Sequence, residues 1–197
     1  MMEKILVVGS PGAGKSTFAR GLHEKTRLPL YYLDMLWHLP DHTTIPEDEF
    51  DRRLLDILLQ PRWIIDGNYS RTLAWRLMYA QTIFWLDFPL EVCLEGIRGR
   101  IGTKREDMPW ETETHLDPEF EQYVRDFPEK RRPLLENLLS AAAAAEKQVV
   151  VFSSRDEAHA YLDRMSVPIR NTDHAPAKAE GPETPGAVRA GRQEKKV

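Results

Sequence analysis

The residues with the clearest chemical meaning form a short glycine-rich segment near the start of the chain. Residues 9–16 read Gly-Ser-Pro-Gly-Ala-Gly-Lys-Ser and match G-x-x-x-x-G-K-[ST] at every fixed position, directly after the apolar run 5–8. This spacing is typical of a phosphate-binding loop, because glycines let successive backbone N–H groups point at one anion. A helix that follows would direct its positive dipole end toward the same point. The pattern therefore predicts a site for a nucleoside triphosphate.

Each position of this loop has an expected role. Lys15 is expected to reach the β- and γ-phosphates and to act in catalysis, and Ser16 is expected to ligate Mg²⁺. Arg155, at the start of the last predicted helix, is also expected to contact the nucleotide. ATP is the predicted nucleotide, and the residues expected to bind it are Gly9, Ser10, Pro11, Gly12, Ala13, Gly14, Lys15, Ser16, Thr17 and Arg155.

Three carboxylates lie at the C-terminal ends of predicted strands. Asp66 comes after Trp63-Ile64-Ile65, and a carboxylate at this end of a strand is placed to hold Mg²⁺ or its water. The alternative for Asp66 is a cap of the next helix. Asp34, after the second predicted strand, is expected to orient or deprotonate an acceptor hydroxyl, or to contact Mg²⁺ through water; the alternative is a solvated loop carboxylate. Asp87 precedes Phe88-Pro89 and is interpreted mainly as a helix-start residue.

Arginines form the second group of candidates, because a planar guanidinium matches the charged oxygens of a transferring phosphoryl group. Residues 98–116 contain Gly99, Gly102, Pro109 and many charges, so this segment is predicted to be a mobile lid. Arg100, Arg105 and Arg131 are the predicted catalytic arginines. Only two or three arginines of the region 98–132 are expected to touch phosphate, and the wider set of candidates is Arg71, Arg76, Arg98, Arg100, Arg105, Arg125, Arg131 and Arg132.

Other side chains give weaker indications. Trp63 and Trp85 fall within predicted strands and are expected in the core, whereas Trp37 and Trp110 lie in predicted loops and are candidates for contact with an acceptor or nucleotide. The six histidines show no metal-ligand spacing. Cys93 lies on the apolar side of a predicted helix and is expected to be a buried thiol, with no disulfide to form.

The elements that must position these residues alternate between strands and helices, which is typical of a parallel sheet covered by helices. Helices are predicted at Lys15–Thr26, after Pro46, from Leu90, over Pro118–Glu146 with a break or kink at Pro128 and Pro133, and at Arg155–Met165. We expect a three-layer α/β P-loop NTPase fold with a five-stranded parallel sheet in the order 2-3-1-4-5. The predicted strands are Lys4–Val8, Leu30–Leu33, Trp63–Asp66, Thr82–Asp87 and Gln148–Phe152.

The length, net charge and hydrophobic pattern of the chain predict one soluble domain. The chain has 197 residues and a net charge of −4, and its longest apolar runs are too short for a signal peptide or a membrane span. Residues 1–167 are expected to form one kinase-like domain, and the Pro-rich segment 168–197 a disordered tail. We expect a cytoplasmic monomer or weak homodimer without membrane contact. Acidic and basic residues nearly balance in 98–132, so nucleic acid is not an expected partner.

Several classes of P-loop protein are excluded by what the sequence lacks. It has no N/T-K-x-D guanine motif and no D-x-x-G switch, as a GTPase would have. A transporter-type ATPase needs a signature helix and more length, and a helicase core would be larger and more basic. A small kinase remains, in which the loop holds the donor and an arginine-rich flap closes over the phosphoryl group.

Four segments together resemble a known family. V-V-G-S-P-G-A-G-K-S-T, Y-Y-L-D-M-L-W, W-I-I-D-G-N-Y-S-R-T and T-I-F-W-L-D-F-P resemble the bacterial topology-modulation proteins, which are related to adenylate kinases, over roughly residues 3–165. The resemblance implies nucleotide-dependent phosphoryl transfer, with Gly9–Thr17 at the donor triphosphate and Asp66 near Mg²⁺. It places Arg71 and Arg76 near the acceptor, Arg98, Arg100 and Arg105 in the lid, and Arg131 or Arg132 in the clamp.

The chain departs from adenylate kinases at the acceptor side. Those enzymes usually have D-G-F-P-R after the third strand, whereas here Asp66-Gly67 is followed by Asn68-Tyr69-Ser70-Arg71. The pocket is therefore not plainly built for AMP. The acceptor is expected to contact Asp34, Trp37, Asn68, Arg71 and Arg76.

The predicted activity is transfer of the γ-phosphoryl group of Mg-ATP to a nucleotide or small-molecule acceptor. Two alternatives stay open from the sequence. One is a regulatory protein that acts on DNA topology with ATP as a switch, as the family name implies. The other is a slow ATPase without an acceptor.

Overall fold

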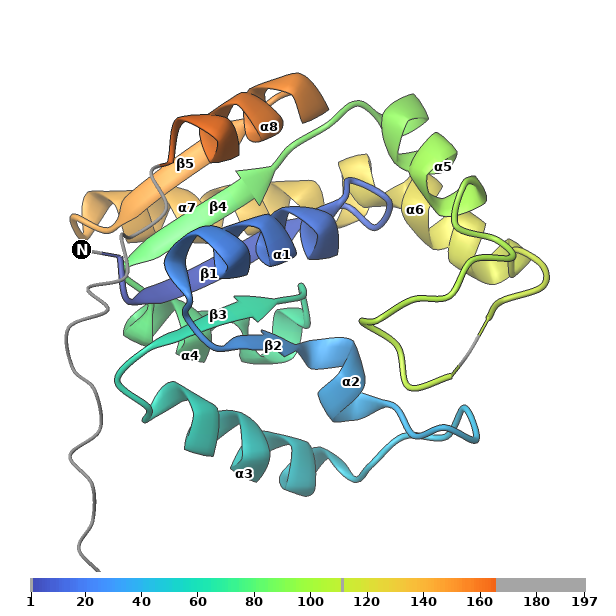
Figure 1. The fold of residues 1–197 in the computed structure, drawn as a ribbon, viewed down its shortest axis with the longest axis horizontal. Coiled ribbons are helices and arrows are strands. Elements are labelled where there is room, and N and C mark those ends of the chain that lie inside the picture. Colours follow the sequence, from blue (N-terminus) through green and yellow to red (C-terminus); the bar gives the residue numbers. More distant parts are fainter. Residues whose placement is uncertain (1, 111, 166–197) are drawn as a thin grey trace, which may run out of the picture.

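The computed structural model describes residues 2–110 and 112–165, which form a parallel sheet with helices on both faces (Figure 1). The strands run in the order β2-β3-β1-β4-β5, as the sequence predicts. Every strand begins at the predicted residue and ends within one residue of the predicted end. Their bounds are β1 Lys4–Gly9, β2 Leu30–Tyr32, β3 Trp63–Asp66, β4 Thr82–Leu86 and β5 Gln148–Phe152.

The central strand β1 is flanked on both sides by parallel neighbours. It pairs with β3 in the register Val7↔Asp66 and with β4 in the register Gly9↔Leu86. Parallel strands covered on both faces read as continuous apolar runs, which explains why Ile5, Leu6, Val7 and Val8 are all fully buried. The C-terminal ends of β1 and β3 therefore meet at one edge of the sheet, where Asp66 lies beside Val7, two residues before Gly9.

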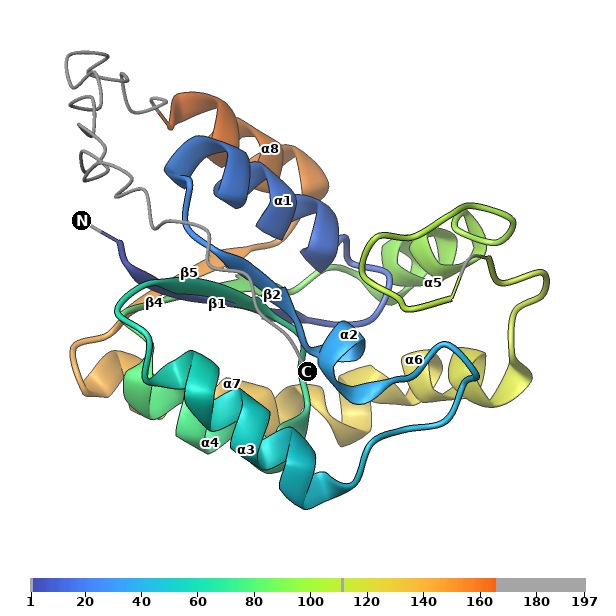
Figure 2. The ribbon, with the colours of Figure 1, turned by 60° about the horizontal axis from the view of Figure 1, so that its bottom comes forward.

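The sheet separates two hydrophobic cores, because successive side chains of a strand point to opposite faces. Figure 2 shows α1 (Lys15–Thr26) and α8 (Arg155–Arg164) above the sheet, and α3 (Glu47–Leu58), α4 (Ser70–Tyr79) and α7 (Arg132–Ala144) below it. Ile5 and Val7 pack with the residues of α1 and α5 (Leu90–Arg98), whereas Leu6 and Val8 pack with those of α3, α4 and α7.

The predicted long helix 118–146 is divided in two. Helix α6 covers Pro118–Lys130, and α7 starts at Arg132 after a change of backbone direction at Arg131. Pro133 lies in the first turn of α7, where a missing N–H costs little. Pro128 lies inside α6, so the break occurs at the second proline and not at both.

A short helix, α2 (Leu33–Trp37), was not expected at its position. It places Asp34 in the first turn of a helix and not at the end of a strand, and it makes Trp37 the last helical residue and not a loop residue. The sequence Leu-Asp-Met-Leu-Trp has a single buried position, Leu33, and this gives too weak a periodic signal to predict a helix of five residues.

The lid segment, residues 98–116, connects α5 to α6 and bends back on itself. Lys104 and Thr112 form an isolated antiparallel bridge, and the backbone N–H of Gly102 donates to the carbonyl of Glu113 at 2.8 Å. The tail predicted at 168–197 lies outside the described residues. No helix within 2–110 or 112–165 has the length and apolar character needed to cross a membrane.

Candidate active site

The glycine-rich segment links β1 to α1 by a tight bend with two distinct glycine requirements. Gly12 has φ +83°, and a Cβ there would lie 2.0 Å from the carbonyl oxygen of Cys93 in α5. Gly14 has φ +92° and caps the start of α1, but a Cβ there would meet nothing within 4 Å. Gly12 is therefore required by close packing, and Gly14 by its left-handed backbone. Both requirements fit the phosphate-binding loop that the sequence predicts.

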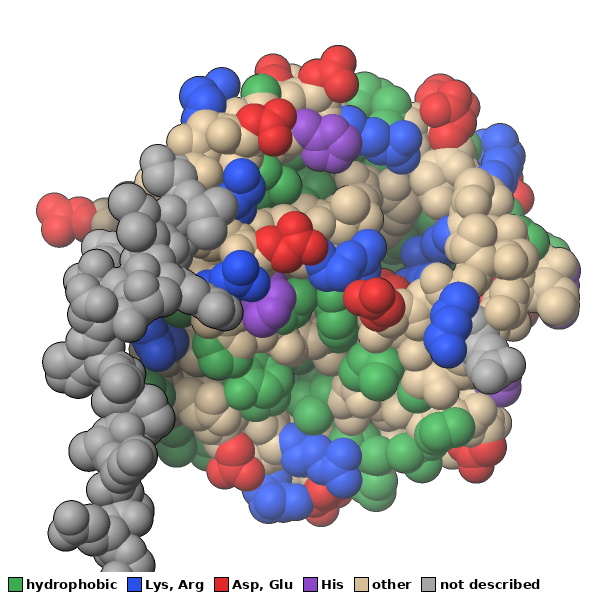
Figure 3. Space-filling view, viewed as in Figure 1, with side chains coloured by type: hydrophobic (Ala, Val, Ile, Leu, Met, Phe, Trp, Pro, Cys, Tyr) green, Lys and Arg blue, Asp and Glu red, His purple; other side chains and the backbone are tan. Residues whose placement is uncertain are grey.

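A cavity of about 1100 Å³ lies over this bend, bounded by α2, the lid segment and α6. Its size is sufficient for a nucleotide and a second small molecule. On the face drawn in Figure 3, positive and negative side chains are interspersed. The structure brings most of the predicted site residues to its wall: Pro11, Gly12, Gly14, Lys15, Ser16, Thr17, Asp34, Asp66, Asn68, Arg100, Arg105 and Arg131.

Lys15 sits at the floor of the cavity. Its Nζ donates to the backbone carbonyl of Ser10 at 3.1 Å, which folds the side chain back over the bend. Burial lowers the pKa of the Lys15 ammonium, and the negative charges of Asp66 and Asp34 oppose that shift. The ammonium is therefore held in a partly desolvated site, where its attraction for an anion is stronger than in water.

Ser16 and Asp66 form the predicted pair at the C-terminal edge of the sheet. The Ser16 hydroxyl donates to Asp66 Oδ2 at 2.6 Å, and Asp66 is only 5% exposed. The other oxygen, Oδ1, is buried and has no hydrogen-bond partner among the described residues. Burial raises the pKa of Asp66 to about 6, although Lys15 and the Ser16 hydroxyl both act to lower it. A buried carboxylate with one unused oxygen beside a serine hydroxyl suits a hard cation such as Mg²⁺.

This raised pKa predicts a pH dependence of metal-dependent nucleotide binding. Because the Asp66 pKa is about 6, the carboxylate is charged above that pH and becomes neutral as the pH falls through it. We expect the affinity for ATP in MgCl₂ to fall about tenfold per pH unit below this value, since a protonated Asp66 cannot ligate a cation.

Calorimetric titrations at several pH values measure this effect. The Asp66→Asn variant is the matched control, because ATP itself takes up a proton in the same range and that contribution is common to both proteins. A wild-type slope no steeper than that of Asp66→Asn would contradict the assignment of Asp66.

Asp34 also faces the cavity and is held in place by Tyr69. The Tyr69 hydroxyl donates to Asp34 Oδ1 at 2.8 Å. Tyr69 has φ +33° at the start of α4, a backbone conformation that directs its ring between α3 and α2. Burial, together with the nearby Asp34 charge, raises the pKa of the Tyr69 phenol, so it stays a hydrogen-bond donor. The sequence did not single out Tyr69, since a loop tyrosine carries no spacing signal.

Three of the candidate arginines line the cavity. The Arg100 guanidinium lies 5.1 Å from the ring of Phe120, and that of Arg131 lies 5.9 Å from the ring of Tyr123. Arg105 makes ion pairs inside the lid segment. Burial lowers the pKa of Arg100, and the neighbouring Arg105 charge acts in the same direction. Clustered guanidinium groups of this kind favour an anionic ligand.

The remaining lid and clamp candidates point elsewhere. Arg98 pairs with Glu121 of α6 at 2.7 Å, and Arg132 pairs with Asp87 at 2.7 Å and lies over the ring of Trp85. Arg131 and not Arg132 therefore faces the cavity. Helix α5 begins at Leu90, with Pro89 and not Asp87 at its N-cap, so the expected helix-start role of Asp87 is not observed. Asp87 is instead the ion-pair partner of Arg132.

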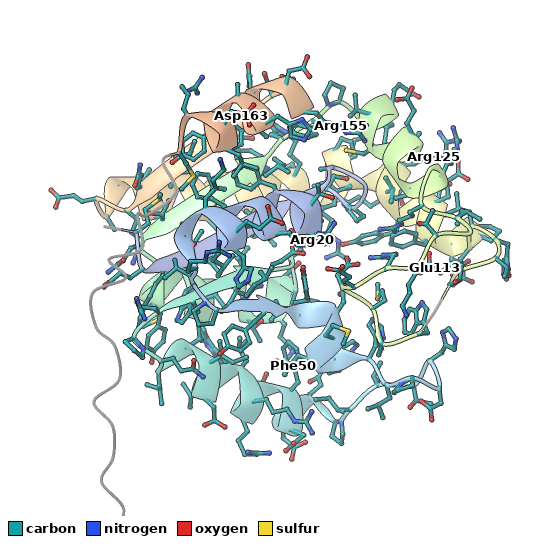
Figure 4. All side chains as sticks on the ribbon, in the orientation of Figure 1. Arg20, Phe50, Glu113, Arg125, Arg155 and Asp163 are labelled. Atoms are coloured by element: carbon teal, nitrogen blue, oxygen red, sulfur yellow. The ribbon has the colours of Figure 1, made fainter. Side chains whose placement is uncertain are left out.

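Three residues predicted to bind the acceptor do not reach the cavity. Trp37 packs edge-on against Phe50, with ring centres 5.3 Å apart, and Phe50 points from α3 toward the sheet (Figure 4). Arg71 is exposed and forms a two-pronged ion pair with Asp51. Arg76 is fully buried.

Arg76 and Asn68 instead hold the backbone beside the phosphate-binding bend. The Arg76 guanidinium donates to the carbonyls of Gly67, Asn68 and Tyr69. The Asn68 side chain exchanges two hydrogen bonds with Gly9, at 3.1 and 2.7 Å, so its amide is already committed although it borders the cavity. These two residues position the β3–α4 loop and do not offer free groups to an acceptor.

Arg155 approaches the bend from outside the cavity. It donates to the carbonyls of Val92 at 3.0 Å and Gly12 at 3.4 Å, so it connects α8, α5 and the bend (Figure 4). Arg155 is not among the residues that line the cavity, and its contact with the nucleotide stays a prediction. Cys93, as expected, is fully buried, with its thiol directed to the carbonyl of Phe88.

Asp107 is the main site residue that the sequence did not indicate. It is 7% exposed, and its Oδ2 lies 2.7 Å from the Ser16 hydroxyl and 2.8 Å from the Arg105 guanidinium. Burial alone would raise the pKa of Asp107, but the hydrogen bonds and charge of Arg105 together with Ser16 lower it to about 2. An aspartate in a loop of mixed charge gives no sequence signal, so only the fold of the lid segment brings it to Ser16.

Two solved structures of shikimate kinases share this fold. Shikimate kinase from Bacteroides thetaiotaomicron superposes with a TM-score of 0.55 and 18% identity, over 83% of this chain and 96% of the other. Shikimate kinase from Acinetobacter baumannii, in complex with shikimate, gives a TM-score of 0.53 and 20% identity, over 83% and 92%. This chain has the P-loop kinase fold. No family model and no curated protein matches the sequence, so the resemblance to topology-modulation proteins stays a prediction.

Proposed function

We propose that the protein is a P-loop phosphotransferase that moves the γ-phosphoryl group of Mg-ATP to a nucleotide or small hydroxyl compound. One observation carries this proposal: Lys15, Ser16, Asp66 and Asp34 converge on one cavity at the C-terminal edge of the sheet. In open α/β sheets, ligands bind in the crevice at this edge. The shared fold with two shikimate kinases is consistent with it.

The donor side of the cavity suits a triphosphate. The backbone N–H groups of the bend and the start of α1 supply fixed dipoles toward an anion. Lys15 adds a positive charge where negative charge would spread during transfer, and Arg100 and Arg105 add guanidinium groups from the lid segment. Because Lys15 and the backbone of the bend are already in place, they would stabilise developing charge without a large rearrangement.

The metal side of the cavity suits Mg²⁺. The Ser16 hydroxyl and the unused Oδ1 of Asp66 are hard oxygen ligands at the same edge of the sheet. When bound, Mg²⁺ would neutralise charge on the phosphate oxygens. Ser16 and Asp66 would hold the cation, and Lys15 would remain directed at phosphate.

Asp34 lies on the side of the cavity where the acceptor would bind. Tyr69 fixes one carboxylate oxygen of Asp34 at 2.8 Å and leaves the other to the cavity. That oxygen is suited to accept the hydrogen of an acceptor hydroxyl and to orient its lone pair toward the phosphoryl group. Arg131, on α6, faces the same space and would attract an acceptor that carries a carboxylate or phosphate.

Replacement of Asp34 separates acceptor activation from donor binding. We expect Asp34→Asn to lower the rate of phosphoryl transfer by about 10²–10⁴, the range for a lost general base, with ATP affinity changed by less than about threefold. Tyr69→Phe, which keeps the ring but loses the hydroxyl, should give a smaller loss of about tenfold. Steady-state kinetics and calorimetry on the same preparations measure both. Equal loss of ATP affinity and turnover in Asp34→Asn would contradict the role.

Phosphorus NMR tests the proposed function directly. The protein is incubated with Mg-ATP and separate nucleosides, nucleotides and small hydroxy acids, with shikimate included because a structural neighbour binds it. A new phosphate-ester resonance that appears with ADP identifies the acceptor and supports the proposal. Inorganic phosphate formed at the same rate with every compound would indicate a slow ATPase, and unchanged ATP would overturn phosphoryl transfer altogether.

A further inference from the structure

The Ser16 hydroxyl faces two buried carboxylates. Asp66 Oδ2 lies 2.6 Å from Ser16 Oγ, and Asp107 Oδ2 lies 2.7 Å from it. A serine hydroxyl has a single hydrogen to donate, so only one of the two oxygens can receive it at a time. Asp107 Oδ2 also accepts from the Arg105 guanidinium at 2.8 Å, so Asp66 Oδ2 is the oxygen left without a donor whenever Ser16 donates to Asp107.

A second observation shows the same deficit of positive charge. Asp66 Oδ1 has no hydrogen-bond partner within the described part of the chain, and Asp66 is 5% exposed and borders the cavity. Buried carboxylate oxygens without donors are unfavourable unless a cation or proton neutralises them. Lys15 is directed to the Ser10 carbonyl and does not fill this place.

We propose that Asp107 is a third ligand of the Mg²⁺ that accompanies the nucleotide, so that the lid segment completes the metal site. This inference rests on the proposed function of the cavity. Ser16, Asp66 and Asp107 would supply three oxygens, and phosphate oxygens and water would supply the others, as Mg²⁺ prefers. No group of three His, Cys, Asp or Glu side chains suited to a metal exists in the described residues. The cation therefore needs the phosphates to bind well.

The ion pairs of Arg105 connect this metal site to the lid arginines. Arg105 contacts Asp107 at 2.8 Å and Glu113 at 3.5 Å, and both pairs are largely shielded from solvent. When Asp107 turns to the cation, Arg105 keeps only the longer contact, and its guanidinium is released toward phosphate. Metal binding and release of the Arg105 guanidinium would thus both follow from one rotation of the Asp107 side chain.

Calorimetry with ATP, in excess MgCl₂ and separately in excess EDTA, tests the inference. The proteins are the wild type, Asp107→Asn and Glu113→Gln, each checked for folding by circular dichroism. Glu113→Gln removes a carboxylate that also pairs with Arg105 but does not touch Ser16. The measured quantity is the ratio of the ATP affinity in MgCl₂ to the ATP affinity in EDTA. We expect this ratio to be about tenfold or more lower in Asp107→Asn than in the wild type, and unchanged in Glu113→Gln. In EDTA, Asp107→Asn should bind ATP at least as tightly as the wild type, because one negative charge beside the phosphates is gone.

A second readout reports on the cation itself. With Mn²⁺ and ADP, a lost protein ligand is replaced by water, so Asp107→Asn should show a larger water-proton relaxation rate than Glu113→Gln. Tighter ATP binding by Asp107→Asn in both MgCl₂ and EDTA would show that Asp107 only blocks the phosphate site, and would overturn the inference. An unchanged ratio of the two affinities in Asp107→Asn would also overturn it while leaving the proposed function intact. Absence of ATP binding by the wild type would overturn both.

Discussion

Lys15→Ala is expected to lower turnover by about 10²–10³ while the protein stays folded, the loss seen when one preorganised charge contact to the transition state is removed. Lys15 is held over the bend by the Ser10 carbonyl at 3.1 Å, in a partly desolvated place beside Asp66 and Asp34. Its ammonium would meet the charge that develops on the transferring group. Steady-state kinetics with the acceptor identified by phosphorus NMR measure the loss.

The control for Lys15 is Lys130→Ala on α6. Lys130 is an exposed lysine whose ion pair with Asp126 lies outside the cavity, so its loss alters net charge by the same amount. Surface pairs of this kind contribute little to stability. Turnover of Lys15→Ala equal to that of Lys130→Ala would contradict a catalytic role for Lys15.

Gly96→Ala is expected to cause a large loss of stability, because α5 packs directly on the bend at this position. A Cβ at Gly96 would lie 2.0 Å from the carbonyl oxygen of Gly12, so α5 or the bend must move. Overpacking against backbone costs about 3 kcal/mol or more, which lowers Tm by about 6–12 °C in a domain of this size. Because the bend is the part displaced, ATP affinity should fall at least about tenfold as well.

Gly99→Ala is the matched control for Gly96, because it adds the same methyl group one turn further along the end of α5. Gly99 has helical backbone angles, and its Cβ would lie 3.2 Å from the Glu95 carbonyl oxygen, a close contact that a shift of a few tenths of an ångström relieves. Thermal unfolding followed by circular dichroism should show little change or a slight gain for Gly99→Ala. Similar Tm values for the two variants would show that the packing of α5 on the bend is looser than described.

The sheet and most helices could be predicted because their signals are local. Strands such as 63–66 are short apolar runs bounded by polar turns, and α1 follows a motif that fixes its first residue. Helix α2 could not be predicted, because five residues hold too little periodicity to distinguish a helix from the end of a strand. The break between α6 and α7 was expected, but the sequence could not show that Pro128 is accommodated inside α6 while Pro133 starts a new helix.

The candidate site divides in the same way. Lys15, Ser16, Asp66 and Asp34 follow strands or the bend, so the parallel topology alone brings them to one edge. Side chains that depend on tertiary packing were not predictable: Arg76 is drawn inward by three backbone carbonyls, and Asp107 reaches Ser16 only because the lid segment folds back. For arginines, the sequence gives the charge but not the partner, which is why Arg71 and Arg76 were assigned to an acceptor they do not face.

Isothermal titration calorimetry of the wild-type protein with ATP in MgCl₂ tests the central claim most directly, since everything proposed for the cavity requires that the bend between β1 and α1 binds a polyphosphate. We predict a saturable heat with one ATP per chain, reduced at least about tenfold in affinity by Lys15→Ala. If folded protein gives no binding heat with any magnesium-bound nucleoside triphosphate at several temperatures, the claim is wrong.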